Sequence, residues 1–254
     1  MKLHFRKYGS GQPMIILHGL FGQSDNWNSL AKQFAENGFE VYAVDQRNHG
    51  LSPHSDVWTY KAMSDDLHEL IMDNDLKNLI LIGHSMGGKT AMQYALDHPE
   101  YVVKLIVVDM APRQYPLHHH SVIQALEAVD FSVVRTRREV EDVLSEYISD
   151  NGTRQFLLKN IYWKEETVLD WRFNLKVISE QIQNVGEPTP DESSSDVETL
   201  FVRGEKSDYV TDDDLQLIQE IFPKCMVETI PAAGHWVHAE KPAAFFECVL
   251  RFIK

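Results

Sequence analysis

The sequence has few cysteines, few positive charges and no long apolar run. Its 254 residues include two cysteines, Cys225 and Cys248, both near the C-terminal end. Two thiols cannot build the disulfide framework of a small secreted protein, so we expect them to be reduced and partly buried. No apolar stretch reaches the length of a membrane span, and residues 1–9 are too polar for a signal peptide. These absences favour a cytoplasmic protein.

The shortage of positive charge excludes further classes of partner. The formal net charge is −14, from 24 Lys and Arg against 38 Asp and Glu. A chain of this charge is repelled at long range by nucleic acid and by anionic membranes. We therefore expect a small-molecule substrate and a protein that is a monomer or a weak dimer.

Short apolar runs alternate with longer helical patterns, which is typical of a mostly parallel sheet with helices on both faces. The strands are predicted at 3–8, 14–17, 41–44, 79–82, 105–108, 199–202 and 226–230, and the helices at 27–36, 63–74, 86–97, 211–221 and 242–252. The alternation stops after Ala111. Residues 112–196 show an amphipathic helical pattern without strand-like runs. We therefore predict a hydrolase-like core from 1–111 and 197–254, interrupted by a helical lid at 112–196.

A G-x-S-x-G motif follows the fourth predicted strand. The run Gly83-His84-Ser85-Met86-Gly87 lies between that strand and a helix, the context in which such a serine is held on a sharp turn at a helix N-terminus. Its small neighbours let strand and helix approach closely. The motif predicts Ser85 as a nucleophile; an incidental serine in a glycine-rich turn is the alternative.

Acyl transfer also requires donors that bind the developing oxyanion. The run His18-Gly19-Leu20-Phe21-Gly22 directly follows the second predicted strand. A turn there places the backbone N–H of Leu20, or alternatively that of Phe21, opposite that of Met86, the residue after the proposed nucleophile. The alternative is a tight turn that only buries apolar side chains.

The base must be chosen among twelve histidines by position. His235 follows the last predicted strand and precedes the last helix, on the rim where open α/β sheets bind ligands. Three consecutive side chains, His118, His119 and His120, cannot all face one metal ion, and we interpret them as surface or lid residues. The sequence shows neither metal-ligand spacing nor a phosphate-binding glycine loop, so we expect no metal and no cofactor.

The acid has two candidates. Asp208 lies in the loop after the penultimate core strand, one residue beyond the usual acid position, where Ser207 stands. Asp109 directly follows the strand at 105–108. A carboxylate at either place is able to reach an imidazole on the same rim. The residues alone leave the two nearly even.

Several longer motifs resemble those of the YbfF-type bacterial esterases, which are related to mitochondrial abhydrolase-domain esterases. They are Arg47-Asn48-His49-Gly50, Gly83-His84-Ser85-Met86-Gly87-Gly88-Lys89, Trp171-Arg172-Phe173-Asn174 and Gly234-His235-Trp236-Val237-His238. The resemblance covers essentially the whole chain. It implies an α/β-hydrolase fold, hydrolysis of carboxylic esters including acyl thioesters, and Asp109 as the acid. In this interpretation His18, Phe21, Trp171, Phe173 and Trp236 contact the substrate.

Two other functions remain open from the sequence. A carbon–carbon bond hydrolase or lyase on the same fold keeps the same serine triad, and only the resemblance weighs against it. A binding protein that retains the pocket without catalysis is the second, because fold does not fix function. An aspartate nucleophile, as in dehalogenases, is excluded by Ser85.

Overall fold

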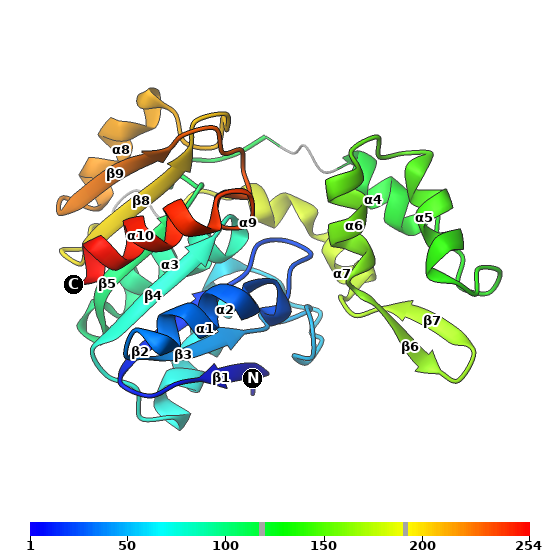
Figure 1. Cartoon of the computed structure of the whole chain (residues 1–254), viewed down its shortest axis with the longest axis horizontal. Coiled ribbons are helices and arrows are strands. Elements are labelled where there is room, and N and C mark those ends of the chain that lie inside the picture. The colour runs from blue at the N-terminus through cyan, green and yellow to red at the C-terminus, as the bar shows by residue number, and fades with distance from the viewer. Residues whose placement is uncertain (117–119, 190–192) are drawn as a thin grey trace.

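Seven strands form one sheet in the computed structural model, which describes residues 1–116, 120–189 and 193–254. Their order across the sheet is β1-β3-β2-β4-β5-β8-β9 (Figure 1). The strands are β1 (Phe5–Tyr8), β2 (Gln12–Leu17), β3 (Phe39–Val44), β4 (Leu79–His84), β5 (Val102–Val108), β8 (Glu198–Gly204) and β9 (Cys225–Ile230). β1 pairs with β3 antiparallel, and the other pairings are parallel.

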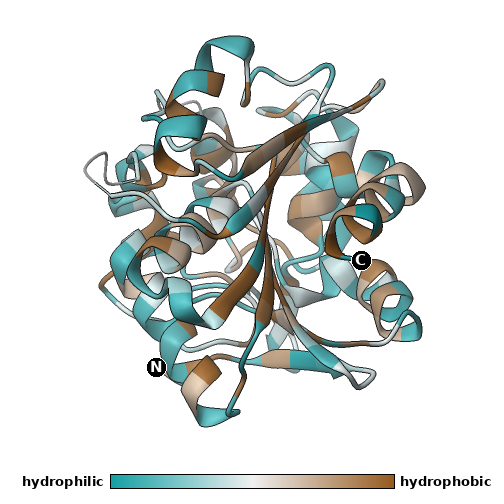
Figure 2. Ribbon diagram, turned by 90° about the vertical axis from the view of Figure 1, so that its left-hand side faces the viewer, coloured by the Kyte–Doolittle hydropathy of each residue, from teal (hydrophilic) through white to brown (hydrophobic). Residues whose placement is uncertain are grey.

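Helices cover both faces of this sheet. One face carries α1 (Asn28–Glu36), the short α9 (Val237–Glu240) and α10 (Pro242–Ile253), and the other carries α2 (Tyr60–Asp73), α3 (Met86–Asp97) and α8 (Leu215–Ile221). The 3₁₀ turns are Ser24–Trp27, Pro99–Tyr101, Ile182–Gly186 and Asp212–Asp214. Figure 2 shows the apolar strands running through the middle of the molecule between more polar helices.

Alternating side chains along each strand build two separate cores. In β2, Ile15 and Leu17 pack toward α2 and α3, whereas Met14 and Ile16 pack toward α1 and α10. All four are at most 1% exposed. Because successive side chains of a strand point to opposite faces, a strand buried on both sides has a continuous apolar sequence. This is why the strands were visible as apolar runs.

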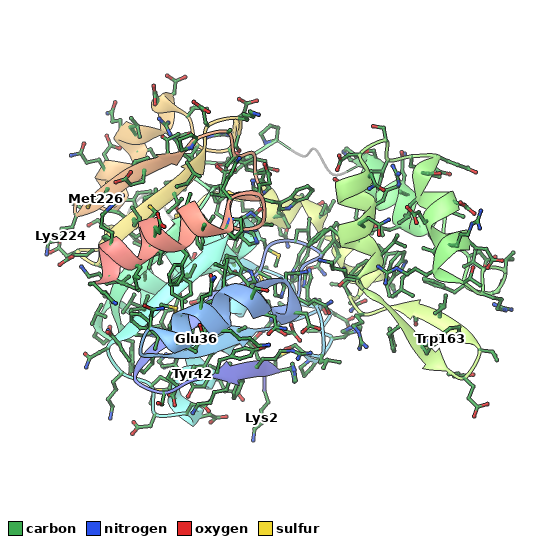
Figure 3. The ribbon with its side chains drawn as sticks, viewed as in Figure 1. Lys2, Glu36, Tyr42, Trp163, Lys224 and Met226 are labelled. Carbon is green, nitrogen blue, oxygen red and sulfur yellow. The ribbon has the colours of Figure 1, made fainter. Side chains whose placement is uncertain are left out.

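The chain between β5 and β8 forms a separate lobe beside the sheet (Figure 1). It contains α4 (His120–Glu127), α5 (Arg137–Ser145), α6 (Asn151–Leu158), α7 (Leu175–Glu180) and a hairpin of β6 (Ile161–Glu165) and β7 (Val168–Trp171). The lobe has its own apolar core, to which Phe21 and Met86 of the sheet region also contribute. Trp163, on the outer part of the hairpin, points away from the rest of the molecule (Figure 3) and is 58% exposed.

The predicted fold class and all seven predicted sheet strands are confirmed. The prediction of a segment without strands at 112–196 is wrong at β6 and β7. Their two-residue connection, Glu166-Thr167, lacks the Asn-Gly or Asp-Gly signature by which short hairpins are recognised. His118 and His119 of the histidine run lie outside the described residues, as do Pro190, Asp191 and Glu192 near the end of the predicted lid. Among described residues, no helix is long and apolar enough to cross a membrane.

Packing of the central strands predicts a large cost for truncating their side chains. Leu81 of β4 is fully buried, whereas Leu51 is 54% exposed. Leu81→Ala should lower the free energy of unfolding by about 2–5 kcal/mol, because it leaves a cavity in a close-packed core. Leu51→Ala, the same change at the surface, should stay within about 0.5 kcal/mol of wild type. Urea unfolding measures both, and similar values for the two variants would contradict the proposed core.

Candidate active site

Ser85 lies on a sharp turn between β4 and α3. Its backbone has φ 53° and ψ −119°, a region that costs a non-glycine residue on the order of 1–3 kcal/mol. The surrounding chain enforces it: Ser85 N–H donates to the Val108 carbonyl of the neighbouring strand (3.0 Å). A Cβ at Gly83 would lie 2.1 Å from the Gly87 carbonyl, and one at Gly87 2.5 Å from the His18 carbonyl. Glycine at these two positions lets strand and helix approach closely enough to form the turn.

His235 connects Ser85 to a buried carboxylate. Its Nε2 lies 3.0 Å from Ser85 Oγ, and its Nδ1 lies 2.7 Å from Asp109 Oδ2. The carboxylate accepts at Nδ1, so the proton resides on Nδ1 and Nε2 is free to accept from the serine. Serine, histidine and aspartate thus form one continuous hydrogen-bond chain.

Asp109 occupies the position after β5 that Ser85 occupies after β4. It also has a positive φ of 50°, and its N–H donates to the Val202 carbonyl of β8 (2.8 Å). Its side chain is fully buried. Besides His235, the carboxylate accepts hydrogen bonds from the Gly204 N–H (3.0 Å) and from the Ser207 hydroxyl. These donors replace the water that a buried anion loses.

The alternative acid, Asp208, is exposed. Among the described residues, no hydrogen bond joins its carboxylate to His235; its backbone carbonyl accepts from Arg113 (3.3 Å). Instead Ser207, which stands at the usual acid position, donates to Asp109. The shift of one residue that separates Asp208 from that position therefore points its carboxylate elsewhere.

Two contacts of His235 were not foreseen from the sequence. The ring of Tyr209 stacks on His235 with centroids 3.9 Å apart and planes 21° apart. His84 Nε2 lies 2.9 Å from the His235 carbonyl, to which it donates. No motif marks an aromatic residue for this role, although Tyr209 directly follows the candidate acid loop. Both contacts restrict the position of the imidazole.

A tight turn lies above the serine. Gly22 N–H donates to the Gly19 carbonyl (2.9 Å), and Phe21, the third residue of the turn, has φ 57°. A Cβ at Gly19 would lie 3.2 Å from Ser85 Cβ, so the turn directly adjoins the nucleophile. No acceptor for the Leu20 N–H occurs among the described residues. Met86 begins α3, so its N–H has no acceptor within the helix.

His18 supports this turn from below. The Gln46 N–H donates to His18 Nε2 (3.0 Å), so the imidazole proton lies on Nδ1, which donates to the Gly19 carbonyl (2.8 Å). Burial lowers the pKa of His18 despite the nearby Asp45 carboxylate. The ring is therefore neutral, and both of its nitrogens are engaged by the backbone.

A cavity of about 220 Å³ opens onto Ser85 and His235. Of the residues predicted to contact substrate, His18, Phe21 and Trp236 line it. Trp171 and Phe173 do not: they line another cavity, within the lobe, although Phe173 packs on Phe21 with centroids 5.0 Å apart. Apolar side chains of the lobe and of the turn at 19–22 also line the cavity that opens onto Ser85, namely Leu20, Val122, Phe156 and Leu157. Among the described residues, no group of three or more His, Cys, Asp or Glu side chains is arranged for a metal ion.

The Arg47-Asn48 segment braces the loops beside the site. Arg47 Nε contacts Asp66 Oδ2 (2.6 Å) in a buried ion pair. Asn48, with φ 65°, accepts a backbone hydrogen bond from Asn174 of the lobe (2.9 Å). Part of the Arg-Asn-His-Gly run thus has a structural role.

Comparison with known proteins places this geometry in a family. Residues 12–147 match the model of the alpha/beta hydrolase fold family. The chain is 39% identical to the sn-1-specific diacylglycerol lipase ABHD11 of Danio rerio, over 97% of this chain and 80% of that protein. It is 34% identical to Esterase YbfF of Escherichia coli, over 100% and 99%. A solved marine microorganism esterase shares 47% identity and a TM-score of 0.96 over 99% of both chains. The chain belongs to the α/β-hydrolase family.

Within that family the protein is a serine hydrolase of carboxylic esters. Several relatives that it matches over most of its length are named as esterases or lipases. The predicted resemblance to YbfF-type esterases is thereby confirmed. None of these relatives is named as a carbon–carbon bond hydrolase, so that alternative has no support.

The buried histidines near the site predict acid sensitivity of the fold. Burial lowers the pKa of His49 and of His238 to about 3, whereas an unfolded histidine titrates near 6.5. The unfolded chain therefore binds more protons below pH 6.5. For each of these two residues, the free energy of unfolding should therefore fall by about 2 kcal/mol when the pH falls from 7 to 5.

Urea unfolding at both pH values measures this loss. His49→Phe should reduce the pH dependence by about 2 kcal/mol, and His54→Phe, at an exposed position, should leave it unchanged. An undiminished pH dependence in His49→Phe would contradict the assignment of a neutral buried imidazole.

Proposed function

We propose that the enzyme hydrolyses esters through an acyl-enzyme on Ser85, with His235 as the base and Asp109 as the carboxylate that orients it. The hydrogen-bond chain from Ser85 Oγ through His235 to Asp109 Oδ2, at 3.0 and 2.7 Å, is the observation that supports this assignment most directly. His235 Nε2 takes the hydroxyl proton as Oγ attacks the acyl carbon. The imidazolium then donates that proton to the leaving oxygen, and a water molecule activated by the same nitrogen releases the acid.

Asp109 stays ionised throughout this cycle. It holds the imidazole in the tautomer with the proton on Nδ1 and stabilises the imidazolium that forms. Its two other donors, the Gly204 N–H and the Ser207 hydroxyl, stabilise the carboxylate in its buried place. The negative charge is thus available next to the imidazole without solvent.

The backbone N–H groups of Leu20 and Met86 are proposed to bind the oxyanion. Both N–H groups belong to backbone that neighbouring contacts hold in place. The Gly19 carbonyl, which precedes the Leu20 N–H, accepts hydrogen bonds from His18 and Gly22, and Met86 directly follows the sharp turn at Ser85. Donors fixed in advance require no reorganisation as charge develops on the carbonyl oxygen. The N-terminus of α3 adds a favourable dipole.

The lining of the cavity supports an apolar acyl group as substrate, in contact with His18, Phe21 and Trp236. Acyl thioesters are a further candidate class, because the same site protonates a sulfur leaving group. We interpret residues 112–196 as a lid over a core made of 1–111 and 197–254. The cytoplasmic location and the monomeric or weakly dimeric state expected from the sequence remain predictions.

Three single substitutions test the triad. Ser85→Ala should lower kcat for p-nitrophenyl acetate by roughly 10⁶-fold, since it loses the nucleophile. Asp109→Asn should lower it by roughly 10⁴-fold, since it loses the correct imidazole tautomer. Asp208→Asn, a matched change at the alternative acid, should stay within about twofold of wild type. Far-ultraviolet circular dichroism checks the fold of each variant. Loss of activity in Asp208→Asn with Asp109→Asn intact would reverse the assignment.

One substitution removes a proposed oxyanion donor without removing the turn. Leu20 is the second residue of its turn, a position that favours proline. Leu20→Pro deletes the N–H and should lower kcat by about 10²–10³-fold with a small change in KM. Leu20→Ala keeps the N–H and should retain most of the activity. Equal effects of the two variants would assign the loss to the side chain.

A further inference from the structure

Lys89 is fully buried, one helical turn after Ser85. Its Nζ donates hydrogen bonds to the carbonyl oxygens of Pro112 (2.8 Å), Arg113 (2.6 Å) and Glu187 (2.9 Å). Three carbonyls match the three N–H donors of an ammonium group. A charged group is retained in a protein interior only where surrounding polar groups replace its water. Here the backbone carbonyl groups take that role and solvate the ammonium.

These carbonyls belong to both ends of the lobe. Pro112 and Arg113 lie where the chain leaves the sheet region, and Glu187 lies where it returns. The two ends are also paired with each other: Thr189 N–H donates to the Pro112 carbonyl (2.9 Å) and Tyr115 N–H to the Gly186 carbonyl (2.8 Å). Lys89 thus joins the nucleophile helix to both connections at once.

Lys89 links the two parts of the molecule that form the cavity. α3 carries Ser85 at its N-terminal end, and Lys89 N–H donates to the Ser85 carbonyl (3.1 Å). The lobe supplies Val122, Phe156 and Leu157 to the cavity wall. The distance between this wall and Ser85 therefore depends in part on how the two connections are anchored on α3, beside other attachments of the lobe such as the hydrogen bond from Asn174 N–H to the Asn48 carbonyl.

We propose that Lys89 is a positioning residue, which anchors the lobe on the nucleophile helix and thereby determines how tightly the enzyme binds esters with long acyl chains. The inference rests on the proposed function of Ser85. A short acyl group contacts the oxyanion turn and the triad, whereas a longer one reaches the wall formed by the lobe. Loss of the anchor should weaken binding of the longer chain and leave the chemical step unchanged.

The test compares p-nitrophenyl acetate with p-nitrophenyl octanoate in wild type and Lys89→Met, which keeps the length of the side chain but not the ammonium. KM for the octanoate should rise about tenfold, while KM for the acetate and both kcat values should change by less than about twofold. Lys61→Met, at a lysine of α2 that is 61% exposed, is the matched control and should resemble wild type. Equal changes in KM for both esters, or a fall in kcat for both, would overturn the proposal.

Hydrogen exchange gives a readout that is independent of turnover. In Lys89→Met the amides of Tyr115 and Thr189, which pair the two connections, should exchange more than about tenfold faster, and the Ser85 amide should be unchanged. If Lys89→Met does not fold, the same KM comparison is made with the milder Lys89→Gln, and amide exchange is measured on the wild-type protein. Exchange of the wild-type Tyr115 and Thr189 amides at the rate of an unstructured peptide would overturn the proposal.

The two hypotheses fail in different ways. Absence of wild-type turnover, or full activity in Ser85→Ala, would refute the proposed function itself. A Ser85-dependent esterase whose Lys89→Met variant binds the octanoate as well as wild type does would refute only the role of Lys89.

Discussion

The hydrogen bond between His235 Nδ1 and Asp109 Oδ2 requires that the loops after β5 and β9 lie close together at the rim of the sheet, beside the turn after β4. Much of the surrounding structure maintains this arrangement. Ser85 and Asp109 each follow neighbouring parallel strands, and each has a positive φ that turns its side chain toward the rim. The N–H of each still donates to the next strand, so the sheet itself holds the strained backbone. His235 reaches this rim from the loop after β9, fixed by Tyr209 and His84.

The sequence predicted the sheet and much of the rim because both follow from local patterns. Strands buried on two faces appear as apolar runs, and Ser85 is marked by the glycines that its turn requires. Spacing along the sequence did not decide which carboxylate pairs with His235. Asp109 directly follows a strand and Asp208 lies in a loop, and both positions are on the same rim. Only the three-dimensional fold shows that the Asp109 carboxylate contacts the imidazole. Tyr209 and the β6–β7 hairpin lacked a signal, since neither a ring stack nor a connection of Glu166-Thr167 has a recognisable pattern.

The lobe and the sheet region divide the work of the site. In the proposed mechanism the chemistry uses backbone and side chains of the sheet rim, where Ser85 and Asp109 directly follow β4 and β5. The lobe supplies Val122, Phe156 and Leu157 to the apolar wall of the cavity. Lys89 lies at the junction of the two, one helical turn after Ser85.

The most direct test of the central claim is proton NMR of the imidazole that joins Ser85 to its acid. With nitrogen-15-labelled histidine, the His235 Nδ1 proton should give a strongly downfield resonance, because it is donated to a buried carboxylate. We predict that this resonance is present in wild type and in Asp208→Asn and is lost in Asp109→Asn. A resonance that survives in Asp109→Asn and disappears in Asp208→Asn would contradict the assignment of Asp109 as the partner of His235.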